Sequence, residues 1–389
     1  MKPDKGMSAH HERALEALRR RGRLRALETA NGIDFASNDY LGLATSQALR
    51  DAVADALARG VAVGAGGSRL LRGNDAEHEA LEAEAAQFFR AERALFFGGG
   101  FVANTALYST LPARGDLVVY DELIHASVHE GLRLSKAEGK PFAHNDTDAC
   151  ETIIQAWRAA GGSGRVWIGA ETLYSMDGDR APLDELAALA DRHDAMLLLD
   201  EAHATGVYGE DGRGLAAHLE GRENVISLHT CGKALGASGA LVLCSETLRE
   251  FLVNRARAFI YATAPSPLIA AAVRAALRIS ASEPQRREAL HARINLASDL
   301  LRTKLGLEPS GSQIQPIIVR SDTRAVELAQ AMKALGYDIR AIRPPTVPEG
   351  TARLRLSLTL NASMEDIADL IEALAQARAL TPADTEASP

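Results

Sequence analysis

Cysteine is scarce in this 389-residue chain, and basic residues do not outnumber acidic ones. The three cysteines, Cys150, Cys231 and Cys244, form no CxxC pair, which argues against a disulfide framework and against a zinc site. Lysine and arginine number 43 against 51 acidic residues, a formal charge of −8, so no overall attraction for phosphate backbones is expected. We expect neither a metal ion nor nucleic acid among the ligands.

Long apolar runs are also missing. None approaches the ~18 consecutive apolar residues that a membrane span requires, and the arginine-rich start of the chain has no apolar signal core. We therefore expect a cytoplasmic protein that does not associate with a membrane. Apolar residues make up 47% of the 389 positions, enough for a large core, and the length predicts two domains.

One short motif occurs without the second motif that a helicase would also need. Asp200-Glu201-Ala202-His203 spells the box of a helicase family, and such a helicase also needs a phosphate loop of the form GxxxxGK followed by Ser or Thr. The nearest candidate fails, because position 227 is Ser227 where the first glycine belongs and Ala234 follows Lys233. A nucleotide-driven helicase or regulatory binding protein is therefore the least favoured interpretation.

Apolar strand patterns alternate with amphipathic helical patterns through the middle of the chain. Segments such as "AMLLLDEA" (195–202) and "NVISLHT" (224–230) are almost continuously apolar, which is typical of strands covered on both faces. They predict an α/β fold in which a mostly parallel central sheet carries helices on both faces. Ligands of such sheets bind at the carboxyl ends of the strands.

The patterns divide the chain into four segments. Residues 1–45 are expected to form an N-terminal arm, with a basic helix from His11 to about Leu27 and a short strand. Residues 46–282 form the large domain, and residues 283–380 form a smaller α+β domain of helices and strands. Residues 381–389, "TPADTEASP", have the composition of a disordered tail.

Three features at the ends of predicted strands carry chemistry. Asp200 follows a buried apolar run, so its carboxylate needs a partner, either a structural arginine or helix cap or a ligand cation. Lys233 is ringed by small residues in "HTCGKALGASGA", a setting that favours an amine nucleophile over a solvated lysine. Gly100 and Phe101 begin a helix after a glycine-rich turn, where N–H groups can bind a phosphate. Together these are the parts needed to hold pyridoxal phosphate.

Eight longer motifs occur in order between residues 37 and 360 of the 389. They are "SNDYLGL", "GAGGSRLLRGN", "GGGFVAN", "DELIHASVHEG", "SMDGDRAPL", "LLLDEAHATGVYGEDGRG", "HTCGKALGASGA" and "RPPTVPEGTARLRLSLT". On these motifs the chain resembles the α-oxoamine synthases, a family of fold-type I pyridoxal-phosphate enzymes. The resemblance implies the same fold, the same cofactor and an obligate homodimer with active sites at the subunit interface.

The resemblance also implies a role for each matching residue. Lys233 would bond the aldehyde of the cofactor, Asp200 would pair with its ring nitrogen, and His125 would stack on its ring; these three are the expected catalytic residues. The other expected cofactor contacts are Gly100, Phe101, Glu171, Ser175, His203, Thr230 and, from the neighbouring subunit, Thr263.

Substrate recognition follows from the same likeness. Arg355 would hold the amino-acid carboxylate, a bidentate task suited to guanidinium, whereas Arg353 alternates to the opposite face of the strand. Arg19 would lie near the remote carboxylate of the acyl substrate, with Arg20 or Arg21 as alternatives. The remaining expected substrate contacts are Asn38, His125 and Thr346.

The implied reaction is a decarboxylating condensation of L-alanine with a pimeloyl thioester, carried by coenzyme A or acyl-carrier protein. The segment "AIRPPTVPEGTARLRL" (341–356) chiefly supports this choice. The alternative is a sister reaction of glycine or serine with another acyl thioester, of the 2-amino-3-ketobutyrate ligase, 5-aminolevulinate synthase or serine palmitoyltransferase type.

Overall fold

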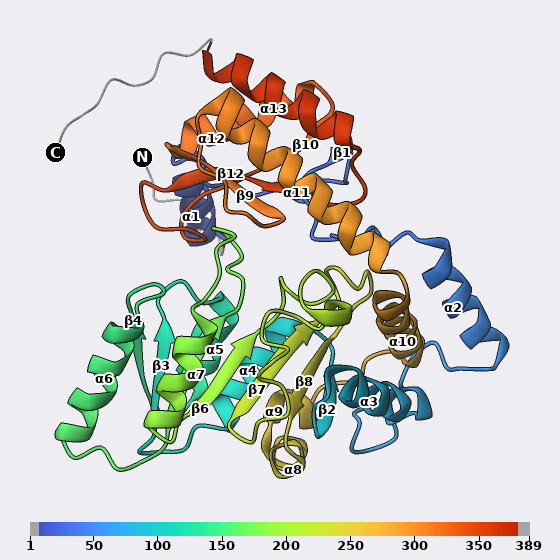
Figure 1. Cartoon of the computed structure of the whole chain (residues 1–389), viewed down its shortest axis with the longest axis vertical. Helices are drawn as coiled ribbons and strands as arrows, with labels where there is room; N and C mark the ends of the chain where they lie inside the picture. Colours follow the sequence, from blue (N-terminus) through green and yellow to red (C-terminus); the bar gives the residue numbers. More distant parts are fainter. Residues whose placement is uncertain (1–7, 380–389) are drawn as a thin grey trace. The chain divides into compact units, whose positions relative to one another are not determined.

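The structure is a computed structural model that describes residues 8–379. Backbone contacts divide these residues into two compact units (Figure 1). The larger unit comprises residues 38–175 and 179–289, and the smaller unit comprises residues 8–37, 176–178 and 290–379. The tail expected at 381–389 lies outside the described residues.

One seven-stranded sheet forms the centre of the larger unit, with the strand order β2-β8-β7-β6-β5-β3-β4. Its strands are β2 (Arg93–Phe97), β3 (Leu117–Asp121), β4 (Glu138–Phe142), β5 (Val166–Glu171), β6 (Met196–Asp200), β7 (Val225–Thr230) and β8 (Ala240–Cys244). All neighbouring pairs are parallel except the two that involve β8. The predicted mostly parallel sheet is confirmed.

Helices cover both faces of this sheet. The helices of the larger unit are α2 (Gln47–Ala58), α3 (Ala76–Phe89), α4 (Gly100–Thr110), α5 (Ala126–Leu134), α6 (Thr147–Ala159), α7 (Leu183–Arg192), α8 (Glu246–Arg255), α9 (Arg257–Ile260) and α10 (Pro267–Ser282), with a short 3-10 turn η1 (Glu210–Gly212), and α2 packs against α10 rather than on the sheet. Alternate residues of β6 point to opposite faces of the sheet. Leu197 and Leu199 pack in one hydrophobic cluster with α6 and α7, and Leu198 packs in a second cluster with α4, α5 and α8. Because both faces are buried, the strands are almost continuously apolar.

The smaller unit is α+β. Its antiparallel sheet has the order β11-β12-β9, made of β9 (Ile314–Arg320), β11 (Arg340–Ile342) and β12 (Ala352–Ser357), and it is accompanied by α11 (Pro284–Leu305), α12 (Asp322–Ala334) and α13 (Met364–Ala379). The N-terminal part of the chain adds α1 (Ala9–Arg20) and β1 (Ile33–Asp34), which pairs in parallel with β10 (Tyr337–Asp338). The backbone N–H of Ser357 also donates to the carbonyl of Phe35 at 3.0 Å.

The observed arrangement differs from the sequence-based expectation in three places. Helix α1 ends at Arg20 rather than near Leu27, because Gly22 adopts a positive φ of 65° and its N–H and that of Arg23 bond back to the last turn. Residues 8–37 join the smaller unit instead of forming a separate arm, since β1 pairs with β10. The boundary expected at 282/283 falls between 289 and 290, within the unbroken helix α11.

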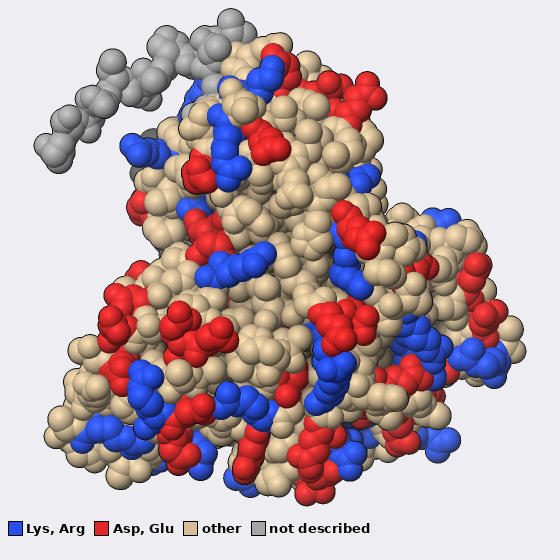
Figure 2. All heavy atoms as spheres, in the orientation of Figure 1, with Lys and Arg blue, Asp and Glu red and all other residues tan. Residues whose placement is uncertain are grey.

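Charged side chains of both signs are interspersed over the visible face in Figure 2. No helix in residues 8–379 is both long enough and apolar enough to cross a membrane.

Candidate active site

A pocket of about 280 Å³ opens in the larger unit where β5, β6 and β7 end. It is lined by Asn38, Gly99, Gly100, Phe101, Asn104, His125, Glu171, Asp200, Ala202, His203, Thr230, Gly232, Lys233, Ser238 and Gly239. Three of these residues, Glu171, Asp200 and Thr230, are the last residues of their strands. The pocket therefore occupies the edge at which parallel sheets bind ligands.

Asp200 carries a buried carboxylate that two donors hold in place. The residue is 7% exposed, and its Oδ1 accepts the backbone N–H of Ala202 at 2.9 Å. Its Oδ2 accepts Nδ2 of Asn104 at 2.7 Å. These two N–H donors fix the orientation of the carboxyl group at the end of β6.

Glu171 lies beside Asp200 on the neighbouring strand, since the two residues are register partners in the β5–β6 pair. Burial and, next, the Asp200 charge raise the pKa of Glu171 well above its usual range. Its Oε2 accepts the backbone N–H of Ser175 at 3.1 Å, and its buried Oε1 has no hydrogen-bond partner among residues 8–379. Burial therefore favours the protonated form of Glu171, and one polar atom, Oε1, is left for a ligand.

His125 is the N-cap residue of α5 and is held through one ring nitrogen. Its Nδ1 accepts the backbone N–H of Ser127 at 3.2 Å and lies 2.7 Å from the Ser127 hydroxyl. Burial lowers the pKa of His125, and the charge of Lys233 lowers it further against the opposing influence of Asp200. The ring is therefore neutral near pH 7.

His203 contacts the segment that precedes α2. Its Nδ1 lies 2.7 Å from the hydroxyl of Tyr40, a fully buried residue whose hydroxyl donates to Oδ1 of Asn38 at 3.0 Å. Tyr40 thus links two predicted site residues. It belongs to the "SNDYLGL" motif, but sequence reasoning assigned it no role.

The first turn of α4 faces the pocket with Gly100 and Phe101, and its N-cap residue, Gly99, supplies no side-chain acceptor. A Cβ at Gly100 would lie 2.6 Å from Cγ2 of Thr230, so only glycine fits beside that methyl group. Glycine here lets the helix start approach the end of β7. The free first-turn N–H groups are the donors that a phosphate needs.

Nine of the fourteen predicted site residues line this one pocket. They are Asn38, Gly100, Phe101, His125, Glu171, Asp200, His203, Thr230 and Lys233. Ser175 is buried and reaches the pocket through its bond to Glu171.

The other four predicted residues lie elsewhere in the described chain. Thr263 is exposed between α9 and α10 and does not line the pocket. Arg19, Thr346 and Arg355 belong to the smaller unit, where Arg19 pairs with Glu16, Thr346 Oγ1 accepts from Arg25 at 3.2 Å, and Arg355 donates to Ser357 at 2.6 Å. Their roles remain predictions.

Arg353 and Arg355 have different partners, as their alternation predicts. Arg353 forms an ion pair with Asp177 at 2.5 Å, whereas Arg355 shares a face with Ser357, two residues further along β12. Both guanidinium groups are buried, at 4% and 6% exposure.

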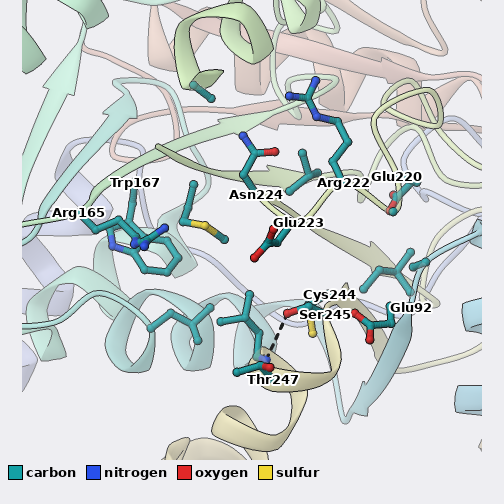
Figure 3. Close-up of a pocket in the computed structure, with 18 of the residues that line it drawn as sticks. Glu92, Arg165, Trp167, Glu220, Arg222, Glu223, Asn224, Cys244, Ser245 and Thr247 are labelled. Carbon is teal, nitrogen blue, oxygen red and sulfur yellow. Dashed lines mark hydrogen bonds between the residues drawn. The ribbon is translucent and has the colours of Figure 1, made fainter. Parts of the chain in front are cut away.

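A larger hollow of about 1080 Å³ lies at the opposite edge of the sheet, where β5, β6 and β7 begin (Figure 3). Charged residues of both signs surround it, among them Glu92, Arg165 and Glu223. It contains none of the predicted site residues and lies at the edge where parallel sheets do not bind ligands, so we place the active site at the smaller pocket.

The side chains of the smaller pocket fit pyridoxal phosphate. One space is surrounded by the amine of Lys233, the carboxyl group of Asp200, the uncapped start of α4 and the unpartnered Oε1 of Glu171. These groups match the aldehyde, the protonated ring nitrogen, the phosphate and a ring substituent of that cofactor.

Comparisons with known proteins agree with this chemistry. The family model of class I and II aminotransferases matches residues 30–374. The 8-amino-7-oxononanoate synthase of Chromobacterium violaceum is 43% identical over 341 residues, which cover 87% of this chain and 88% of that protein. The solved 8-amino-7-oxononanoate synthase of Francisella tularensis is 30% identical with a TM-score of 0.76, covering 90% of this chain and 98% of that one.

A solved structure of serine palmitoyltransferase with pyridoxal phosphate bound shares the fold at 24% identity, with a TM-score of 0.88 over 97% of this chain and 99% of that one. The chain belongs to the class I and II aminotransferase family. Within that family it is an acyltransferase-type enzyme similar to the 8-amino-7-oxononanoate synthases, and its cofactor is pyridoxal phosphate.

Sequence reasoning missed the residues that hold the catalytic side chains. Asn104 and Ser127 occur within the quoted motifs "GGGFVAN" and "DELIHASVHEG" but were assigned no role. The available signal was a polar residue on the apolar helix "FVANTALY", one turn after the glycine-rich start. Their partners are 96 and 23 residues away in sequence, so pattern alone does not reveal them.

Proposed function

We propose that the enzyme condenses L-alanine with a pimeloyl thioester and releases carbon dioxide to give 8-amino-7-oxononanoate, a step of biotin biosynthesis. One observation carries the proposal: Asp200 and Lys233 share a pocket in a chain 43% identical to an enzyme of that name. When bound, pyridoxal phosphate supplies an electron sink that stabilises negative charge on the amino-acid Cα.

The residues of the pocket would divide the work. Lys233 would hold the cofactor through its aldehyde and would take the Cα proton of the amino acid at Nζ. Asp200 would keep the ring nitrogen protonated, and His125 would pack against the ring. Gly100, Phe101, Ser175, Thr230 and His203 would complete the cofactor site.

Recognition of the substrates falls to residues outside that pocket as well as to Asn38. Arg355 binds the carboxylate of alanine, and Arg19, or Arg20 or Arg21, binds the remote carboxylate of the acyl chain. Thr346 contacts the substrate. We propose further that the enzyme is a cytoplasmic homodimer in which Thr263 reaches the cofactor of the neighbouring subunit.

Thioester consumption over a grid of amino acids and acyl chains tests this substrate choice. L-alanine with pimeloyl-coenzyme A or pimeloyl-acyl-carrier protein should give the highest kcat/KM, well above glycine or serine with shorter or longer acyl chains. A preference for glycine or serine with another acyl thioester would assign the sister reaction instead.

Replacement of the lysine tests the chemistry. Lys233→Ala should abolish turnover and remove the visible absorbance of the bound cofactor, because no other amine lines the pocket among the described residues. A Lys233→Ala protein that keeps both properties would contradict the proposal.

A further inference from the structure

Four side chains, those of Asp200, Asn104, Ser127 and His125, are joined in a row by hydrogen bonds beside the cofactor pocket. Asn104, on the second turn of α4, and Ser127, on the first turn of α5, are 3% and 0% exposed. The two helices approach closely, because a Cβ at Gly131 of α5 would lie 2.7 Å from Cβ of Tyr108 on α4. This close packing brings Asn104 and Ser127 within hydrogen-bond distance.

The orientation of the Asn104 amide is determined by its partners. Its Nδ2 lies 2.7 Å from Oδ2 of Asp200 and 3.0 Å from Oγ of Ser127. An ionised carboxylate only accepts hydrogen bonds, so the NH₂ group rather than the amide oxygen must face Asp200. The amide nitrogen has two hydrogens, and these two contacts use both.

The direction of the next bond follows. Because the Ser127 hydroxyl accepts from Asn104, its single hydrogen is available for Nδ1 of His125 at 2.7 Å. The backbone N–H of Ser127 points at the same Nδ1 at 3.2 Å. A ring nitrogen that receives two donors holds a lone pair, so the proton of the neutral ring lies on Nε2.

The charge state of the ring agrees with this assignment. Burial lowers the pKa of His125, the charges of Lys233 and His129 lower it too, and Asp200 alone opposes them. A neutral imidazole ring carries one N–H hydrogen. Because two donors of Ser127 point at Nδ1, this hydrogen lies on Nε2.

We propose that Asn104 and Ser127 are positioning residues that tie Asp200 to His125 and hold His125 as the Nε2–H tautomer. The inference rests on the proposed roles of Asp200 and His125 in the cofactor pocket. It has a chemical consequence: the free edge of the His125 ring offers a hydrogen-bond donor to substrate, not a basic nitrogen. Removal of the Cα proton is thereby left to Lys233.

Nitrogen NMR of the cofactor-loaded protein tests the tautomer directly. With ¹⁵N-labelled histidine, and His125→Gln to assign the resonances, Nδ1 of His125 should show the shift of an unprotonated nitrogen and Nε2 that of a protonated one. This pattern should persist from about pH 6 to pH 8. A proton on Nδ1, or a ring that becomes doubly protonated in that range, would overturn the proposal.

Variants of the serine test its hydroxyl. Ser127→Ala should move the His125 resonances toward a mixture of tautomers, because only the backbone donor remains on Nδ1. Ser127→Thr keeps the hydroxyl and should restore the wild-type pattern. Identical spectra for the wild type and Ser127→Ala would contradict the role of the hydroxyl. These spectra do not depend on which substrates the enzyme takes. They therefore test the tautomer even if the assay over amino acids and acyl chains assigns another reaction.

Kinetics test the link to Asp200. Asn104→Leu should lower kcat by about 10- to 100-fold, the worth of one hydrogen bond to a charged group, and change KM for the amino acid by less than about threefold. It should also shift the pH at which the cofactor absorbance titrates, because Asp200 loses one of its two N–H donors.

Ser109→Ala is the matched control, since it removes a hydroxyl from the same helix that bonds only to carbonyls of that helix and to Thr110. It should leave kcat and the absorbance titration unchanged. Equal losses in the two variants, or a wild-type titration in Asn104→Leu, would refute the positioning role.

Discussion

Glu171 and Asp200 are neighbouring carboxylic acids with different hydrogen-bond partners. Their strands pair in parallel with these two residues in register, so both acids lie on one edge of the sheet. Asp200 receives donors from Asn104 and Ala202, whereas burial and the Asp200 charge raise the pKa of Glu171. A second negative charge, on Glu171, is therefore disfavoured in this buried site.

Amide replacements of the two acids should therefore differ in effect. Asp200→Asn should keep the cofactor bound but lower kcat by about 100-fold or more, because the amide cannot stabilise a protonated ring nitrogen as a carboxylate would. Glu171→Gln preserves a neutral side chain and should lower kcat by less than about tenfold. Steady-state kinetics with a cofactor titration measure both effects, and equal losses would contradict the assigned charge states.

His144 is a charged residue in the same unit. Its Nδ1 donates to Asp121 at 2.9 Å and its Nε2 donates to Asp179 at 2.7 Å. Burial lowers the pKa of His144, but the two hydrogen bonds outweigh burial and raise the pKa to about 10. The imidazolium therefore stabilises the fold below the usual histidine pKa of about 6.5, and the stabilisation is lost as pH rises through about 10.

Unfolding by urea at different pH values tests this contribution. At pH 7, His144→Gln should lower the free energy of unfolding by about 1–2 kcal/mol, a modest value because the imidazole is 24% exposed. The difference between wild type and variant should shrink between pH 7 and pH 10.5. A difference that is constant with pH would show that His144 does not act through its charge.

At the scale of elements, the first residue of α4, Gly100, packs closely against the last residue of β7, Thr230. The strand–glycine turn–helix order around Gly100 is local in sequence, and the sequence predicts it together with its use for a phosphate. Gly100 and Thr230 lie close together although they are 130 positions apart, and no sequence pattern predicts this approach. Gly22, after which α1 does not continue, is also a local feature of the sequence. It was not predicted to end the helix because the surrounding arginines favour a longer helix.

A pair of substitutions tests the fit between these elements. Gly100→Ala should weaken pyridoxal phosphate binding by roughly tenfold or more, because the new methyl group would lie 2.6 Å from Cγ2 of Thr230. Adding Thr230→Ser removes that Cγ2, keeps the hydroxyl, and should restore most of the affinity. Cofactor titrations of the single and double variants measure this, and additive losses would contradict the steric explanation.

At the scale of the whole molecule, neither compact unit is a continuous segment of chain. The larger unit is interrupted by residues 176–178, and the smaller unit needs residues 8–37 as well as 290–379. Composition and periodicity predicted a large α/β part and a small α+β part, but assigned residues 1–45 to neither. The two-residue strand β1 is too short to carry a pairing signal, and its partner β10 lies about 300 residues away.

A fragment experiment tests the composition of the smaller unit. Residues 290–389 alone should lack cooperative thermal unfolding, because they lose the β1–β10 pair and the buried Phe35, whose carbonyl accepts the N–H of Ser357. Fusion of residues 8–37 ahead of residue 290 through a flexible linker should restore a cooperative transition in circular dichroism. Equal melting of the two fragments would show that the N-terminal part is dispensable.

The contact between Gly100 and Thr230 also constrains how this sequence can change over generations. If alanine at position 100 is harmful beside threonine at position 230 and acceptable beside serine, as the 2.6 Å approach predicts, the order of the two mutations matters. A lineage can cross between the two states if Thr230→Ser comes first and glycine is still present at position 100, but not if Gly100→Ala comes first. Among relatives we therefore expect alanine at position 100 to occur together with serine or another residue lacking a methyl branch at position 230.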